Sequence, residues 1–274
     1  MSTFKLPDTD VEVKLAEGLT KEELLNFPAF KNWHTRLTSS LALQHTNKSH
    51  PFHTFPYALN SITIQSFTKF SASKIGFLNL NASITNSNNE YLSGSIFLRG
   101  PSVGMLVILT PDDLEGDARD GEKWVIMTVQ PRIAAGSVEF VELPAGMVDG
   151  GSFGGAAARE IYEEVGLKIE ESELINLSEL AGQSQQRSDE GLPNAMFPSA
   201  GGCDEFIPLF LCEKKVLREE LDSWTGRLTG LRDEGEKITL KLVKLENLWR
   251  EGARDAKALG AWALYDGLRR SGKL

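Results

Sequence analysis

The arrangement of apolar and polar residues predicts helices near both ends of the chain and strands between them. Thr20 lies three residues before Glu23, a capping box that starts a helix, and the helix is expected to reach about Leu43 with a break near Pro28. Residues 44–56 are polar and hold two prolines and three of the four histidines. These histidines are an alternative metal site, but the composition favours a solvated linker.

The middle of the chain has the short apolar runs of strands, which begin at about Ser61, and residues 86–89 predict a hairpin turn. Later strands are expected at 103–110, 124–129, 137–143, 206–212 and 236–243, with helices at 153–165 and 254–270. This order indicates an α/β fold, an α/β/α sandwich around a mixed sheet, preceded by a smaller β-rich N-terminal domain. The expected divisions are a helical extension and linker, a β-rich domain and a main domain, at 1–57, 58–110 and 111–274.

The charge balance narrows the functional classes. The chain holds 29 Lys and Arg against 38 Asp and Glu, a net charge of −9, which argues against nucleic acid as a partner because that affinity depends on basic residues. Its apolar runs fall short of the ~20 residues of a membrane helix, so no membrane association is expected. Cys203 and Cys212 are too few for a disulfide framework, which indicates a reducing, cytoplasmic setting.

Three carboxylates are expected on one face of the predicted helix at 153–165. At about 100° per residue, Glu160, Glu163 and Glu164 share a narrow arc opposite an apolar face. Arg159 lies at i,i+4 from Glu163 and can pair with it, and Gly166 is placed to end the helix in the left-handed conformation. A solvated acidic face is the alternative, but clustered carboxylates also suit a hard divalent cation such as Mg²⁺.

The flanking residues favour the metal. Pro144-Ala145-Gly146, a tight loop, and Arg159-Glu160-Ile161 followed by Glu163-Glu164 and Gly166-Leu167 together resemble the Nudix box. The resemblance implies a Nudix-type fold in which Glu160, Glu164 and the backbone carbonyl of Ala145 bind Mg²⁺ or Mn²⁺. It also implies a catalytic role for Glu163, oriented by Arg159. The pattern departs from the family at Gly151, where the box has a glutamate, so the number of metals stays open.

Two further stretches resemble the ADP-ribose and ADP-sugar diphosphatase branch of this family. One is Gln130–Ala135, and the resemblance implies that Arg132 binds substrate phosphate, as a guanidinium does well. The other is the stretch from Phe197 to Glu205, which implies substrate-binding roles for Pro198, Ser199, Gly201 and Glu205. A surface arginine and a plain turn are the competing interpretations.

A third stretch, Leu231–Ile238, resembles the loop that supplies the family's catalytic carboxylates. By position, Glu234 matches the general base and Glu236 a further metal ligand, with Glu236 and Glu205 as the next candidates for the base. An ordinary acidic turn is the alternative.

The resemblance to plant-type ADP-sugar diphosphatases covers about 60% of the chain, from Arg99 to the last helix. It implies Mg²⁺-dependent hydrolysis of ADP-glucose or ADP-ribose to AMP and a sugar 1-phosphate, by a homodimer whose N-terminal β domain contributes to the interface. A Nudix enzyme for another nucleoside diphosphate derivative and a non-catalytic Nudix-fold nucleotide-sugar binding protein are the alternatives. The preferred sugar stays open.

Overall fold

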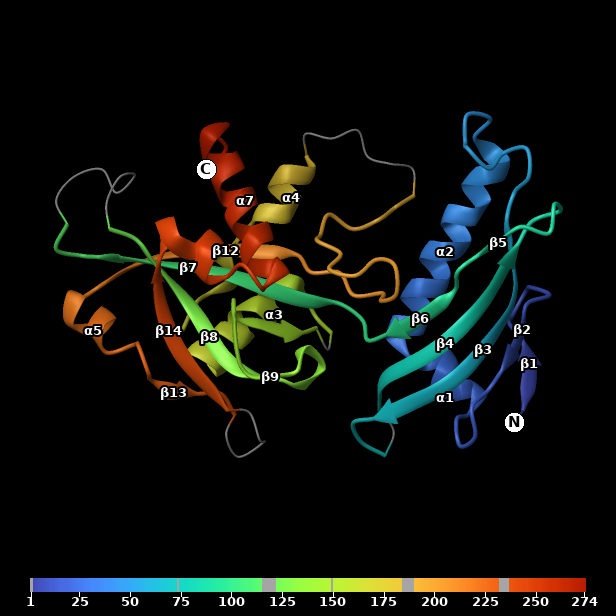
Figure 1. Cartoon of the computed structure of the whole chain (residues 1–274), viewed down its shortest axis with the longest axis horizontal. Coiled ribbons are helices and arrows are strands. Elements are labelled where there is room, and N and C mark those ends of the chain that lie inside the picture. Colours follow the sequence, from blue (N-terminus) through green and yellow to red (C-terminus); the bar gives the residue numbers. More distant parts are fainter. Residues whose placement is uncertain (1, 73, 115–121, 149, 184–189, 232–236) are drawn as a thin grey trace. The chain divides into compact units, whose positions relative to one another are not determined.

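The computed structural model describes residues 2–72, 74–114, 122–148, 150–183, 190–231 and 237–274 of the chain. The chain forms two compact units, each with its own core, and each is described by itself (Figure 1). The first unit comprises Met1–Pro101, Gln186–Pro193 and Ser199–Phe206, and the second comprises Ser102–Gln185, Asn194–Pro198 and Ile207–Leu274.

The first unit is built on a sheet whose strand order is β1-β2-β3-β4-β5, with β6 also paired to β4. These strands are β1 (Thr3–Lys5), β2 (Glu12–Lys14), β3 (Ala58–Lys69), β4 (Ile75–Thr85), β5 (Tyr91–Leu92) and β6 (Ser95–Leu98). β4 and β5 are antiparallel neighbours joined through the turn at 86–89, so the predicted hairpin is confirmed. Alternate residues of β3 and β4, such as Ile62 and Leu80, face the core, as the period of two requires.

Two helices, α1 (Lys21–Asn26) and α2 (Pro28–Thr46), belong to the first unit. Both hydrogen bonds of the predicted capping box between Thr20 and Glu23 are present, and Pro28 is the first residue of α2, so the predicted break is confirmed. Leu24 and Phe30 are buried in one core with residues of β2, β3 and β4. Residues 1–57 are therefore part of this unit, not the separate extension that we expected.

The second unit contains a mixed sheet of order β11-β12-β7-β8-β14-β13, with β10 paired to β7 and β9 paired to β8. Its strands are β7 (Ser102–Pro111), β8 (Trp124–Arg132), β9 (Ser137–Glu142), β10 (Ala145–Met147), β11 (Ile175–Asn176), β12 (Leu209–Val216), β13 (Leu228–Thr229) and β14 (Ile238–Lys244). β12 and β7 are parallel, whereas the other pairs are antiparallel.

Helices cover both faces of this sheet. The helix α3 (Phe153–Glu160) packs with Met105 and Ile126 on one face, whereas α7 (Ala256–Arg270) packs with Leu106 and Met127 on the other. Every residue of β7 is buried, as expected for a central strand covered on both sides. The remaining helices are η1 (Ile133–Ala135), η2 (Ile161–Val165), η3 (Glu171–Glu173), α4 (Leu177–Gly182), α5 (Arg218–Asp222), η5 (Leu245–Asn247) and α6 (Leu248–Glu251). The predicted α/β/α sandwich with a mixed sheet is confirmed.

The central strands β7 and β8 pair with each other at one end only, through Ile108–Val125 and Leu109–Trp124. Toward its other end each strand takes a different neighbour, because Ala145 of β10 pairs with Gly104 and Glu142 of β9 pairs with Thr128. The turn between β9 and β10 therefore lies where the two central strands have separated. This is the part of the second unit that carries the candidate site.

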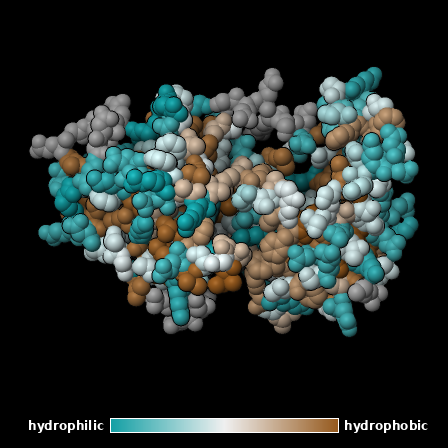
Figure 2. Space-filling view, in the orientation of Figure 1, coloured by the Kyte–Doolittle hydropathy of each residue, from teal (hydrophilic) through white to brown (hydrophobic). Residues whose placement is uncertain are grey.

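The division of the chain differs from our expectation of a boundary at residue 110. β7 is the centre of the second sheet, so this unit begins at Ser102. The short strands β10, β11 and β13 and the short helices α4, α5 and α6 were not predicted, because two to six residues are too few to show a period. Hydrophilic residues cover much of the visible surface, with apolar residues in patches (Figure 2). In the described parts of the chain, no helix has both the length and the apolarity to cross a membrane.

The segment Ser199–Phe206 is anchored to the first unit by the buried carboxylate of Asp204. This carboxylate accepts hydrogen bonds from the backbone N–H groups of Arg99, at 2.8 Å, and Gly100, at 3.2 Å. Burial raises the pKa of Asp204, while these two donors and the charge of Arg36 oppose the rise. The carboxylate thus adds to the backbone hydrogen bonds between this segment and β6, which run from Phe97 N–H to the Gly202 carbonyl and from Asp204 N–H to the Phe97 carbonyl.

We expect Asp204→Ala to lower the free energy of unfolding by about 2–3 kcal/mol, because it leaves backbone N–H groups without an acceptor. Urea denaturation measures the loss, and hydrogen exchange over residues 97–100 locates it. Asp204→Asn is the matched control, since its amide oxygen still accepts, and it should lose about half as much. Equal losses in the two variants would contradict this role for the carboxylate.

Candidate active site

The helix that carries the predicted carboxylates changes its winding halfway. Ser152 caps α3 by accepting a hydrogen bond from Gly155 N–H, and the helix continues from Ile161 to Val165 as the π-helical segment η2. It ends at Gly166, whose φ of 77° is left-handed, as predicted. A π-helical turn, with i→i+5 hydrogen bonds, is rare and occurs frequently at functional sites.

The wider turn alters the expected side-chain pairs. We predicted that Arg159 and Glu163 would pair at i,i+4, but no ion pair between them is found in the described chain, and Arg159 is exposed. The prediction assumed α-helical winding throughout, whereas the helix winds in that way only as far as Glu160.

Glu164 is buried, with 5% of its surface exposed, and is held by two donors. Its Oε2 accepts from the backbone N–H of Ala145 at 3.0 Å, and its Oε1 accepts from Nε2 of Gln130 at 3.3 Å. Burial raises the pKa of Glu164 to about 8; the two hydrogen bonds oppose this rise, and the charges of Glu160 and Glu142 add to it. Burial of this carboxyl group therefore disfavours its ionised form.

Glu160 lies against the loop that follows β9. A Cβ atom built on Gly146 would stand 1.8 Å from the carboxyl carbon of Glu160, so a larger residue at this position would displace the Glu160 carboxylate. At the other end of the helix, the Thr229 hydroxyl in β13 donates to the carbonyl oxygen of Glu164. The Pro-Ala-Gly loop and the carboxylate helix, separate in the sequence, are thus in direct contact through Ala145–Glu164 and Gly146–Glu160.

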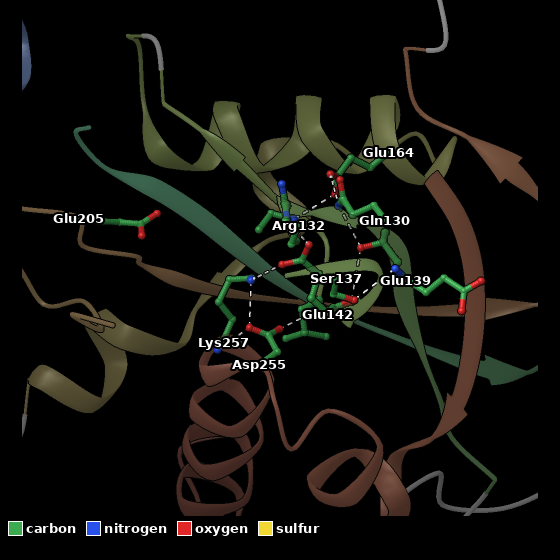
Figure 3. A network of polar contacts seen from close by, with 12 residues as sticks. Gln130, Arg132, Ser137, Glu139, Glu142, Glu164, Glu205, Asp255 and Lys257 are labelled. Carbon is green, nitrogen blue, oxygen red and sulfur yellow. Dashed lines mark hydrogen bonds and ion pairs between the residues drawn. The ribbon is translucent and has the colours of Figure 1, made fainter. Parts of the chain in front are cut away.

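A chain of charged side chains lies beside these carboxylates (Figure 3). Glu142 is buried, and its Oε1 accepts from Nε of Arg132 at 2.5 Å, while its Oε2 accepts from Nζ of Lys257 at 2.7 Å. Lys257 also donates to Oδ1 of Asp255 at 3.0 Å, and Oδ2 of Asp255 accepts from the N–H of Leu143 at 2.9 Å. Two cations and two anions therefore alternate along a network from the start of α7 to Arg132.

From the sequence we predicted no role for Lys257, Asp255 or Glu142. Burial disfavours the charge of Lys257, but the charges and hydrogen bonds of Asp255 and Glu142 prevail and raise its pKa. Asp255 also caps α7 by accepting from the backbone N–H of Lys257. This cap was the available sequence signal, since an Asp directly before a helical pattern indicates an N-cap.

The other predicted site residues are distributed between the two units or lie outside the described residues. Pro198 belongs to the second unit, whereas Ser199, Gly201 and Glu205 belong to the first. There the Ser199 carbonyl accepts the N–H groups of Gly202 and Cys203 in a turn, and Glu205 forms an ion pair with Arg99 at 3.2 Å. Glu234 and Glu236 lie outside the described parts of the chain.

The side chains of the second unit fit a hard cation in part. Glu160 and Glu164 offer oxygen ligands, the type that Mg²⁺ prefers. Burial raises the pKa of Glu164, and the charges of Glu160 and Glu142 add to the rise. Within the described segments, no three Asp, Glu, His or Cys side chains are grouped so that they alone would hold a metal ion. For a cation bound here, further ligands would have to come from the backbone, from water or from residues outside these segments.

The raised pKa of Glu164 predicts how metal-free stability depends on pH. The folded value, about 8, lies above the ordinary value of 4.5, so the folded state holds the proton more tightly and loses stability as pH rises from about 4.5 through 8. Glu164→Gln has no such proton. In EDTA, we therefore expect the melting temperature of Glu164→Gln minus that of the native chain to increase steadily from pH 5 to pH 9.

The control for this experiment is Glu246→Gln, an exposed position in the same unit, for which the difference should stay constant with pH. A difference for Glu164→Gln that is equally flat would mean that Glu164 ionises as an ordinary carboxyl group.

The chain resembles known proteins over most of its length. A family model described as "NUDIX domain" matches residues 101–262. The chain is 32% identical over 272 residues to the Arabidopsis thaliana protein named "Nudix hydrolase 14, chloroplastic", covering 97% of this chain and 80% of that protein. A solved structure titled "Crystal structure of ADP compounds hydrolase" is similar with a TM-score of 0.45 and 15% identity, covering 79% of this chain and 99% of that chain.

The family model spans more than half of the chain, and it includes the loop, the carboxylate helix and the Arg132 network within its bounds. The plant relative aligns along nearly the whole chain. The chain therefore belongs to the Nudix hydrolase family.

Proposed function

We propose that this Nudix hydrolase cleaves the diphosphate of ADP-sugars such as ADP-glucose and ADP-ribose, with Mg²⁺ or Mn²⁺, to AMP and a sugar phosphate. The observation that carries the proposal is that one unit places the carboxylates Glu160 and Glu164 beside a network that ends in the guanidinium of Arg132. Carboxylates bind a divalent cation, and a guanidinium binds phosphate. Together they match the two components of a metal-bound diphosphate.

In the second unit, different residues bind the cation and the phosphate. Glu160, Glu164 and the carbonyl of Ala145 would hold the cation, which when bound neutralises diphosphate charge and lowers the pKa of water. Arg132 orients a phosphate through its terminal nitrogens, because its Nε already donates to Glu142. Gln130 and the Ala145 N–H keep the Glu164 carboxylate in place.

The proposal keeps the other residues that the family resemblance implies. Glu234 takes the proton from the attacking water, with Glu236 as a metal ligand and Glu205 as the alternative base. Glu163 and Arg159 complete the catalytic set on the helix. Pro198, Ser199 and Gly201 contribute to binding of the nucleotide sugar.

Assembly and location are also part of the proposal. We expect a homodimer in the cytoplasm, and both cysteines, Cys203 and Cys212, are free thiols, which suits a reducing compartment. The printed name of the Arabidopsis relative places that protein in the chloroplast.

The assay that tests the reaction incubates the chain with ADP-glucose, ADP-ribose or ATP plus Mg²⁺ and measures AMP. We expect AMP from the ADP-sugars, and a loss of kcat of about a hundredfold or more in Glu164→Gln, because an amide is a poorer ligand than a carboxylate. Circular dichroism should show an unchanged fold, and Glu246→Gln should keep native turnover. Native Mg²⁺-dependent activity in Glu164→Gln would refute the assignment.

Absence of AMP from every substrate, together with binding of ADP-glucose, would favour the alternative of a non-catalytic nucleotide-sugar binding protein. One structural feature favours testing this non-catalytic alternative. The position where the family box has a glutamate is Gly151, and its φ of 77° is a left-handed conformation in which a glutamate would be strained.

The assignment of the general base makes a separate prediction. Glu234→Gln should lower kcat by about 10²-fold or more and change KM little, since a base acts in the transition state and contributes little to substrate binding. Steady-state kinetics with the preferred ADP-sugar measures both constants. An unchanged kcat would move the base to Glu236 or Glu205, and the corresponding Gln variants would then be compared.

A further inference from the structure

We propose that Lys257 is a positioning residue for Arg132: by occupying one oxygen of Glu142, it limits Arg132 to a single hydrogen bond and leaves the terminal guanidinium nitrogens available for phosphate. The inference rests on the proposed function, in which Arg132 binds the diphosphate. It assigns a role in substrate affinity to a lysine 125 positions further along the chain.

Glu142 lies between two cations. Each carboxylate oxygen has one cationic partner, Nε of Arg132 at 2.5 Å and Nζ of Lys257 at 2.7 Å. No hydrogen bond from the two terminal nitrogens of Arg132 to another described residue is found. The Arg132 side chain is 41% exposed, whereas that of Glu142 is 4% exposed, so the guanidinium reaches solvent while its anchor stays buried.

Loss of Lys257 would change how Arg132 binds Glu142. Arginine and a carboxylate frequently form a bidentate pair, in which two nitrogens bind two oxygens. Here the second oxygen is taken, so the bidentate pair is blocked. If Lys257 lost its charge, the buried second oxygen of Glu142 would need a donor, and Arg132 is the exposed, movable cation beside it. A terminal nitrogen would then turn from the phosphate to Glu142.

Contacts with Asp255 and Gly104 hold Lys257 in place. Asp255 binds Nζ of Lys257 with one oxygen and the N–H of Leu143 with the other, so the lysine is fixed relative to the residue next to Glu142. The stem of Lys257 packs over Gly104, where an added Cβ would lie 3.4 Å from its Cδ. The network thus runs from the α7 side of the sheet to the side of the carboxylate helix, as Figure 3 shows.

The test measures binding of ADP in the presence of Mg²⁺ by titration calorimetry, together with KM and kcat for ADP-glucose. Lys257→Met should weaken ADP binding and raise KM about tenfold while kcat stays within about twofold, the size of one charged hydrogen bond. The matched control is Lys123→Met. Lys123 is also a nearly buried lysine, paired with Glu213 at 3.0 Å in the same unit, and its loss should leave ADP affinity within about twofold of native.

Combined variants separate positioning of Arg132 from simple stabilisation. Because Lys257 acts through Arg132, Arg132→Met with Lys257→Met should bind ADP no more weakly than Arg132→Met alone. The pair Glu142→Gln with Lys257→Met removes both buried charges, so it also serves if Lys257→Met folds poorly. Its neutral amide offers Arg132 only one acceptor oxygen, and ADP affinity should recover to within about threefold of native.

The inference is overturned if Lys257→Met binds ADP as the native chain does while Arg132→Met binds it weakly. It is also overturned if the effects of the two variants multiply, or if Glu142→Gln with Lys257→Met stays as weak as Lys257→Met alone. A failure of the proposed hydrolysis would be seen separately, as an absence of AMP in the activity assay. The binding of ADP is measured without turnover, so it tests the role of Lys257 alone.

Discussion

The candidate site depends on a buried carboxylate, Glu142, that has a cationic partner on each oxygen. A buried charge that loses one partner is strongly destabilising, so Arg132, Lys257 and Asp255 must be held together around it. These residues come from the end of β8, the end of β9 and the start of α7. The requirement that this charge be satisfied therefore ties the end of β8 to the start of α7, which packs on the face of the sheet opposite the carboxylate helix.

The separation of β7 from β8 gives this network its place. Fully paired central strands would leave no room for the β9–β10 turn, but these two strands share only two residue pairs. The turn enters there and brings Ala145 to Glu164 and Gly146 to Glu160. The same turn also carries Glu142, so the carboxylate helix and the charged network meet at one short segment of chain.

The sequence predicted more of the fold than of the site. Long elements with a clear period, such as α2, β7 and α7, lie close to where the pattern placed them, and Gly166 ends its helix as expected. The expected pair of Arg159 and Glu163 is absent from the described chain. The π-helical turn that holds Glu163 was not predicted, because such a turn has no signature in the pattern of apolar residues. Residues 1–57 contribute to a core with strands that follow them, which local periodicity does not reveal.

By itself, the sequence determined the residue types and spacings of the Pro-Ala-Gly loop and of Glu160 and Glu164, because those depend on near neighbours along one loop and one helix. Only the tertiary structure decided that Lys257 and Asp255 belong with Glu142, from which Lys257 is 115 positions away. It also decided that Glu164 is buried, with its pKa raised to about 8. Burial and ion pairing depend on which surfaces meet across the sheet, and that is a property of packing between distant segments.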